Sequence, residues 1–133
     1  MVIINMSELA AQFKGLVNDG YIHFFVFMVC GDIATGLIKG LLNKQGDSTK
    51  GLLGGVKHLL VVVMVLTAVP YLKLLGFEQF ATTFVMFFIA FYGVSLTENW
   101  GQLGLPLPSF VKEALIKLKN ETDKGKLSNK EDK

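Results

Sequence analysis

The stretch YIHFFVFMVCGDIATGLIKGLL, residues 21–42, decides the fold because it is long and apolar enough to cross a lipid bilayer. At 1.5 Å per residue, a helix over these residues is about 33 Å long, close to the roughly 30 Å of a bilayer's hydrocarbon core. Asp32 lies near its middle. A carboxylate at that depth costs about 2.5–3.5 kcal/mol on insertion scales, so it is expected to face another helix or water rather than lipid. Function is therefore expected around Asp32.

Asp32 is the first residue of a polar and small-residue stripe on one face of this predicted helix. Residues spaced three, four, seven, eight and eleven positions apart share a helical face. The Asp32 stripe consists of Asp32, Thr35, Gly36, Lys39, Gly40 and Asn43. Its two glycines form a GxxxG pair, which lets two helix backbones approach closely in a membrane. The stripe is predicted to mediate self-association and to line a pore in the open oligomer. The competing interpretation is a fixed polar contact between helices.

Composition places the chain among small membrane proteins. Of its 133 residues, 51% are hydrophobic, and the mean hydropathy of +0.47 is too high for a typical soluble domain of this size. The first twenty residues lack the pattern of a removable signal peptide, so the spans themselves are expected to direct insertion. Cys30 is the single cysteine, which excludes an internal disulfide and a CxxC site. His23 and His58 have no second ligand at helical spacing, so no metal site is predicted.

The predicted fold is all-α, with three transmembrane helices. An N-terminal arm, residues 1–20, contains a short amphipathic helix that either lies at the membrane surface or extends the first span. The spans are expected at about 21–42, 56–75 and 80–98, with a polar, glycine-containing loop over residues 43–55. Tyr21 and Trp100 are suited to anchor the ends of the first and third spans at the membrane interface.

The chain after the third span is predicted to leave the membrane. Residues 101–119 contain a connector rich in proline and glycine, followed by a short basic amphipathic helix. Residues 120–133 include a single apolar residue, Leu127, and are predicted to be a disordered charged tail. This part of the chain is expected in water or at the membrane surface.

Lysine distribution predicts the orientation in the membrane. The loop between the first two spans and its flanks carry Lys39, Lys44, Lys50 and Lys57, and residues 109–133 hold seven lysines. The second connection and the N-terminal arm carry one lysine each. Because cytoplasmic segments are enriched in basic residues, the first loop and the C-terminus are predicted inside and the N-terminus outside the cytoplasmic membrane.

The sequence offers no recognisable catalytic chemistry. It contains no nucleophile with a plausible base, no paired carboxylates at helical spacing and no phosphate-binding loop, so no enzyme activity and no cofactor are predicted. The chain contains no arginine and no pattern of basic and aromatic surface residues, which argues against nucleic acid as a partner. Glu98 and Asn99 lie at the cytoplasmic end of the third span, where Glu98 is expected to pair with a lysine of the first loop.

Two blocks of the sequence resemble the phage lysis and toxin-secretion holins, a group that includes the clostridial toxin-release holin and holins of Gram-positive phages. The blocks are GDIATGLIKGLLNKQGDSTKGLLGGVKHLLVVV, residues 31–63, and GVSLTENWGQLGLPLPSFVKEALIKL, residues 93–118. The resemblance implies a small protein that oligomerises in the host cytoplasmic membrane and opens large non-specific pores. It implies a second copy of the chain and membrane lipids as partners, and endolysin or a protein toxin as the passenger.

Other functions remain open on the sequence alone. The resemblance does not separate a lysis holin from a toxin exporter or an antiholin. A structural membrane subunit would use the Asp32 stripe for permanent packing without opening a pore. A small ion channel or proton-coupled carrier would use Asp32 itself, but no inverted repeat or second buried acid accompanies that residue.

Overall fold

A computed structural model describes the chain except for residues 45–46, 115, 118–119, 122–123 and 125–133. The described residues form helices and contain no strand. A short helix α1 (Met6–Gly15) and a 3-10 turn η1 (Leu16–Asn18) precede three long helices, which are α2 (Gly20–Leu42), α3 (Ser48–Leu74) and α4 (Glu78–Gln102). Each long helix is long and apolar enough to cross a membrane. The predicted all-α fold with three transmembrane helices is confirmed.

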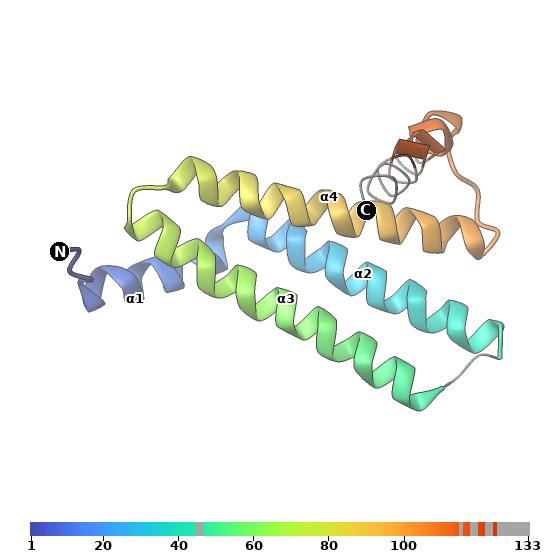
Figure 1. The fold of residues 1–133 in the computed structure, drawn as a ribbon, viewed down its shortest axis with the longest axis horizontal. Helices are drawn as coiled ribbons and strands as arrows, with labels where there is room; N and C mark the ends of the chain where they lie inside the picture. The colour runs from blue at the N-terminus through green and yellow to red at the C-terminus, as the bar shows by residue number, and fades with distance from the viewer. Residues whose placement is uncertain (45–46, 115, 118–119, 122–123, 125–133) are drawn as a thin grey trace, which may run out of the picture.

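The three long helices lie side by side in one bundle (Figure 1). α2 and α4 run in the same direction. α3 runs in the opposite direction and connects the C-terminal end of α2 to the N-terminal end of α4. α2 and α4 make the most extensive contact in the molecule, and α3 packs more on α4 than on α2. α1 packs against α3 at the end of the bundle where α2 begins.

Side chains and glycines set the helix ends. Asp19 caps α2 by accepting a 2.9 Å hydrogen bond from the Tyr21 amide, and Asp47 caps α3 through the Thr49 amide at 3.1 Å. Gly76, with φ of +86°, ends α3 and allows the tight turn into α4. There the Gly76 amide donates to the Lys73 carbonyl and the Phe77 amide donates to the Leu72 carbonyl, a Schellman arrangement.

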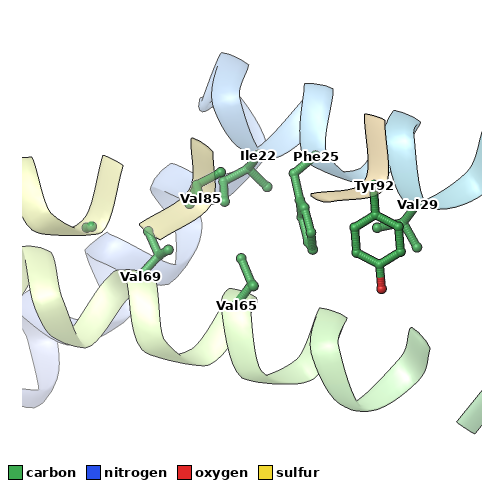
Figure 2. Packing of buried hydrophobic residues seen from close by; sticks show 8 residues of the cluster. Ile22, Phe25, Val29, Val65, Val69, Val85 and Tyr92 are labelled. Carbon is green, nitrogen blue, oxygen red and sulfur yellow. The ribbon is translucent and has the colours of Figure 1, made fainter. Parts of the chain in front are cut away.

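An apolar core joins the three helices over half of their length (Figure 2). Phe25 and Val65 are completely buried, and Tyr92 is 1% exposed. The remaining buried members come from all three helices and are Ile22, Val29, Val69, Ala81 and Val85. Most other apolar side chains on these helices are exposed, as a lipid-facing surface requires.

Two helix boundaries differ from those predicted. α3 begins at Ser48 rather than near Val56, so Gly51, Gly54 and Gly55, which were expected in a polar loop, are helical. The reason is the Asp47 cap, which starts the helix before the glycines. α4 extends past residue 98 to Gln102 and includes Trp100. Which residues of each helix lie within the bilayer stays a prediction.

The C-terminal segment contains the predicted helix. Residues 109–114, 116–117, 120–121 and 124 are helical, and the last three of these lie in the segment that was predicted to be a disordered tail. The rest of that prediction, on residues 122–123 and 125–133, lies outside the described residues. Gly104, with φ of +76°, ends α4 and leads into the connector.

Candidate functional site: a polar cluster between three helices

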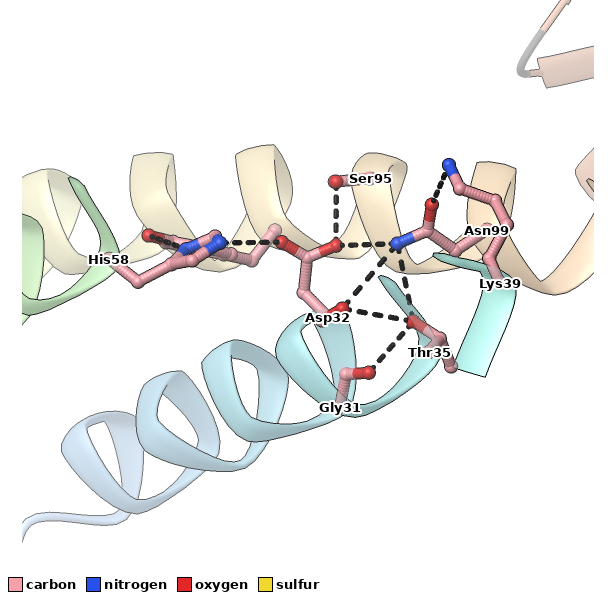
Figure 3. A network of polar contacts seen from close by, with 8 residues as sticks. Gly31, Asp32, Thr35, Lys39, His58, Ser95 and Asn99 are labelled. Atoms are coloured by element: carbon pink, nitrogen blue, oxygen red, sulfur yellow. Dashed lines mark hydrogen bonds and ion pairs between the residues drawn. The ribbon is translucent and has the colours of Figure 1, made fainter. Parts of the chain in front are cut away.

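Eight polar side chains from three helices form a connected cluster around Asp32, mostly drawn in Figure 3. This Asp32 cluster consists of Asp32, Thr35 and Lys39 from α2, His58 from α3, and Tyr92, Ser95, Asn99 and Gln102 from α4. It lies beside the apolar core, in the half of the bundle that ends at the connection between α2 and α3. Polar side chains at that depth require partners, because lipid offers no hydrogen bonds.

Asp32 is the buried centre of the cluster. Its residue is 6% exposed, and its Oδ1 accepts hydrogen bonds from Ser95 Oγ at 2.6 Å and Asn99 Nδ2 at 3.0 Å. Both donors come from α4. The carboxylate is therefore paired within one molecule, and its hydrogen bonds join α2 to α4.

Asn99 makes contacts to three residues of α2. Its Nδ2 donates to Asp32 and also lies 3.2 Å from Thr35 Oγ1, while its Oδ1 accepts a 2.9 Å hydrogen bond from Lys39 Nζ. Lys39 Nζ also donates to Gln102 Oε1 at 2.9 Å. Among the described residues, no buried side-chain nitrogen or oxygen lacks a partner.

His58 brings α3 to the cluster. Its Nδ1 lies 3.1 Å from the Tyr92 hydroxyl, and its Nε2 lies 3.9 Å from Asp32 Oδ2. The second distance is within ion-pair range but too long for a hydrogen bond. With the ring proton on Nε2, Nδ1 accepts from Tyr92 while the N–H points to Asp32, so one tautomer serves both contacts.

A cleft of about 570 Å³ opens beside the cluster, between α2, α3 and α4. Asp32, His58, Ser95 and Asn99 contribute its polar wall. Its other walls are Ile33, Gly36, Leu37 and Phe91, together with the three glycines of α3, Gly51, Gly54 and Gly55.

The structure divides the predicted Asp32 stripe into two parts. Asp32, Thr35 and Lys39 contact α4 within the molecule. Gly36 borders the cleft, and a Cβ there would be 3.8 Å from Asn99 Nδ2, whereas a Cβ at Gly40 would meet nothing within 4 Å among the described residues. Asn43 is the exposed C-cap of α2. Gly36 and Gly40 therefore do not form the close contact between α2 and α4.

Two other glycines lie at that contact. A Cβ at Gly31 would be 3.2 Å from Leu96 Cδ2, and one at Gly93 would be 3.0 Å from Met28 Cε. These residues were not singled out from the sequence, because neither has a second glycine four positions away in its own helix. Their place follows from the pairing of two helices that are distant in the chain.

The remaining predicted residues have different surroundings. Glu98 is exposed, and in the described part of the chain it forms no ion pair with a lysine, so Asn99 and Gln102 rather than Glu98 bind Lys39. Tyr21 is exposed near the start of α2. Trp100 is also exposed, and its indole N–H donates to the Pro106 carbonyl at 3.2 Å.

A second polar contact joins α2 and α3 at the opposite end of the bundle. Lys73 Nζ donates to Asp19 Oδ2 at 2.8 Å. Partial burial acts to raise the pKa of Asp19, but the hydrogen bond and charge of Lys73, with the Ile22 and Tyr21 amides, outweigh it and hold that pKa below its ordinary value of 3.8. Asp19 thus both caps α2 and binds α3.

The hydrogen bonds of the Asp32 cluster pair α2 with α4. Ser95 donates to Asp32 rather than to His58, so these three residues do not form the serine–histidine hydrogen bond of a catalytic triad. The polar contacts of His58 go to Tyr92 and Asp32 instead. Among the described residues, no group of three histidine, cysteine or acidic side chains is placed to hold a metal ion.

Comparison with known proteins gives a consistent set of relatives. The model of the bacteriophage holin family matches residues 10–120. An uncharacterized 14.9 kDa protein in the nagH 3' region of Clostridium perfringens is 39% identical over 121 residues, covering 90% of this chain and 91% of the relative. The probable holin of Bacillus phage phi105 is 33% identical over 106 residues, 77% of each chain. No solved structure matches significantly.

Proposed function

The chain belongs to the bacteriophage holin family, and we propose that it oligomerises in the cytoplasmic membrane of a bacterium and opens large non-specific holes. Three apolar helices and this family fit a multi-pass membrane protein. The observation that carries the proposal is the Asp32 cluster, because it gives a small apolar bundle a set of polar side chains that water can solvate. Such side chains are what a water-filled hole requires on its wall.

The closed and open states differ in what contacts Asp32. In the closed molecule, Ser95 and Asn99 bind the carboxylate, and exposing it without a replacement for those contacts is unfavourable. In an open oligomer, water in the adjoining cleft replaces them. The residues of the Asp32 stripe would then line the hole, with Asp32, Thr35 and Lys39 already on one face of α2.

The passenger and the partner follow from the same proposal. A hole of this kind would release endolysin to the cell wall or export a protein toxin, and an antiholin would regulate its timing. Membrane lipids surround the exposed apolar faces, and the second copy of the chain is the partner that completes the hole.

A non-pore subunit is the second candidate, and one observation favours it. The contacts of Asp32 are made within a single molecule, which is what permanent helix packing requires. This alternative, which includes an antiholin role, predicts that the chain accumulates in the membrane without releasing any macromolecule.

Expression in bacteria tests the proposal. Cells would produce the full chain from an inducible promoter, with a membrane-impermeant dye in the medium and a separately produced cytoplasmic endolysin. A holin is expected to admit the dye abruptly and to cause lysis only when both proteins are present. Dye exclusion at normal membrane levels of the chain would contradict the proposal, and loss of membrane potential without release of endolysin would indicate an ion channel.

The orientation is proposed from the lysines, with the N-terminus outside and the connection between α2 and α3 in the cytoplasm. A cysteine introduced by Ser48→Cys in a Cys30→Ala background reports on that connection. It is expected to react with an impermeant maleimide only after spheroplasts are broken. Reaction in intact spheroplasts before any permeabilisation would show that this connection lies outside and that the orientation is the opposite one.

A further inference from the structure

α3 is tied to its neighbours by polar contacts at two places. Lys73, in its last turn, binds Asp19, and His58 contacts Asp32 and Tyr92. Between these two places, Val65 and Val69 are buried in the apolar core, at 0% and 1% exposure. From His58 to Leu74, α3 therefore has a continuous set of partners on α2 and α4.

The N-terminal turns of α3, before His58, have no such packing. Gly51, Gly54 and Gly55 face the cleft, and a Cβ at any of them would meet nothing within 4 Å among the described residues. Leu52 and Leu53 are exposed. Among the described residues of α3, His58 is thus the one nearest the N-terminus whose polar side chain contacts both α2 and α4.

The contacts of His58 are few and easily exchanged. Its ring lies 5.5 Å from that of Tyr92, centroid to centroid, and its side chain is 28% exposed. The 3.9 Å separation from Asp32 Oδ2 leaves that oxygen facing the cleft without a hydrogen bond from the imidazole. A contact of this kind is broken more readily than the shorter hydrogen bonds that join α2 to α4.

We propose that His58 is a latch that limits how far the N-terminal half of α3 diverges from the α2–α4 pair, and that its release lets this half swing further outward and widens the cleft. The inference rests on the proposed holin function and adds the element that moves. In this first step α2 and α4 remain joined through Ser95 and Asn99, and water enters the widened cleft beside Asp32, where it replaces those contacts when the oligomer opens. The apolar core and the contact between Lys73 and Asp19 hold the other half of α3 in place.

A distance measurement detects the swing directly. Spin labels on Leu41→Cys and Leu52→Cys, both exposed positions near the diverging ends of α2 and α3, would be introduced in a Cys30→Ala background of the full chain in lipid nanodiscs. His58→Phe keeps an aromatic ring beside Tyr92 but removes both polar contacts. This variant is expected to add a second, longer distance between the two spin labels. The fraction of molecules with the longer distance should rise about threefold, as for loss of one interhelical hydrogen bond.

Three further variants give the result its meaning. His58→Gln keeps a donor and an acceptor and is expected to retain the parental distance. Tyr92→Phe removes only the hydroxyl and is expected to give an intermediate shift. His23→Phe removes the other histidine of the chain, at the far end of α2, and is expected to change nothing. If His58→Gln widens the distance as much as His58→Phe, the polar contacts are not the latch. The latch proposal is also contradicted if the His58→Phe protein does not accumulate in the membrane and Tyr92→Phe leaves the distance between the labels unchanged.

The time of dye entry in expressing cells links the latch to function. His58→Phe is expected to shorten the delay before dye entry, and His23→Phe is expected to leave it unchanged. A parental chain that admits dye, with no change in distance or delay in His58→Phe, would overturn the latch and leave the holin proposal intact. A distance change in a chain that never admits dye would support the latch and overturn the holin proposal.

Discussion

Ser95 of α4 donates a 2.6 Å hydrogen bond to Asp32 of α2, although the two residues are 63 positions apart in the chain. A short bond from a hydroxyl to a carboxylate is among the stronger hydrogen bonds in proteins. It joins α2 to α4 at a buried carboxylate, which would be costly in lipid without such a partner. The pairing of these two helices is therefore the most constrained part of the polar cluster.

Asp32 is expected to influence opening through its charge. Asp32→Asn keeps an acceptor for Ser95 and Asn99 but removes the charge, whereas Asp32→Leu removes both. Both variants should insert, because each lowers the cost of crossing the bilayer, but both should delay or abolish dye entry, with leucine the more severe. Membrane levels by immunoblot and the time of dye entry measure this. Dye entry at the parental time in Asp32→Leu would contradict it.

Asn99 is expected to stabilise the folded bundle. Asn99→Leu leaves Asp32, Thr35 and Lys39 with fewer partners, and one missing buried partner typically costs about 1–3 kcal/mol. Glu98→Leu, at the adjacent exposed position, should change stability by less than about 0.5 kcal/mol. Thermal unfolding of the purified proteins in the same detergent compares them. Equal stability of the two variants would remove Asn99 from this role.

Gly31 and Gly40 are expected to affect different contacts. Gly31→Leu should push α4 away, because its Cβ alone would be 3.2 Å from Leu96, and so should lower monomer stability and membrane accumulation. A Cβ at Gly40 would meet nothing within 4 Å among the described residues, so the monomer should tolerate Gly40→Leu. If Gly40 mediates self-association, Gly40→Leu should accumulate normally but give weaker oligomers on chemical crosslinking. Unchanged oligomers would exclude that role for Gly40.

Asp19 is expected to contribute stability that depends on pH. Because the pKa of Asp19 is lowered in the folded protein, its contribution is present above pH 3.8 and is lost as pH falls further. Asp19→Asn can still cap α2 but removes the ion pair with Lys73, worth up to about 1 kcal/mol, while Asp19→Ala also removes the cap, worth about 1 kcal/mol more. Unfolding at neutral and acidic pH separates the two effects. If Asp19→Asn and Asp19→Ala are equally stable, the Asp19 side chain does not stabilise the protein by capping α2.

Helical spacing was sufficient to place Asp32, Thr35 and Lys39 on one face, because that relation is local in sequence. Helical spacing alone does not show which residues pair with them, since the pairing of α2 with α4 is a tertiary contact. It does show that Tyr92, Ser95, Asn99 and Gln102 share one face of α4, which is a signal that the sequence analysis did not use. His58 entered the sequence analysis only as a histidine without a second metal ligand, so its contacts with Asp32 and Tyr92 were not predicted.

Gly51, Gly54 and Gly55 explain the misplaced start of α3. Glycine lowers helix propensity by about 1 kcal/mol per residue, so GLLGG was interpreted as a turn. Asp47 followed by Ser48 and Thr49 is a helix-start signal, and the structure follows it. The three apolar runs, by contrast, were identified from composition alone, because a bilayer requires about 20 apolar residues in sequence for each crossing.

The separation in sequence between Asp32 and its partners has a consequence for biosynthesis. Ser95 and Asn99 lie 63 and 67 residues downstream, so a ribosome has not yet made them when α2 enters the membrane. Asp32 must therefore be inserted on the strength of the apolar residues around it, before its partners on α4 exist. Each newly made chain passes through a stage in which its carboxylate is available to water, to lipid headgroups or to another chain. The stage ends only when α4, the last of the three long helices, has been translated.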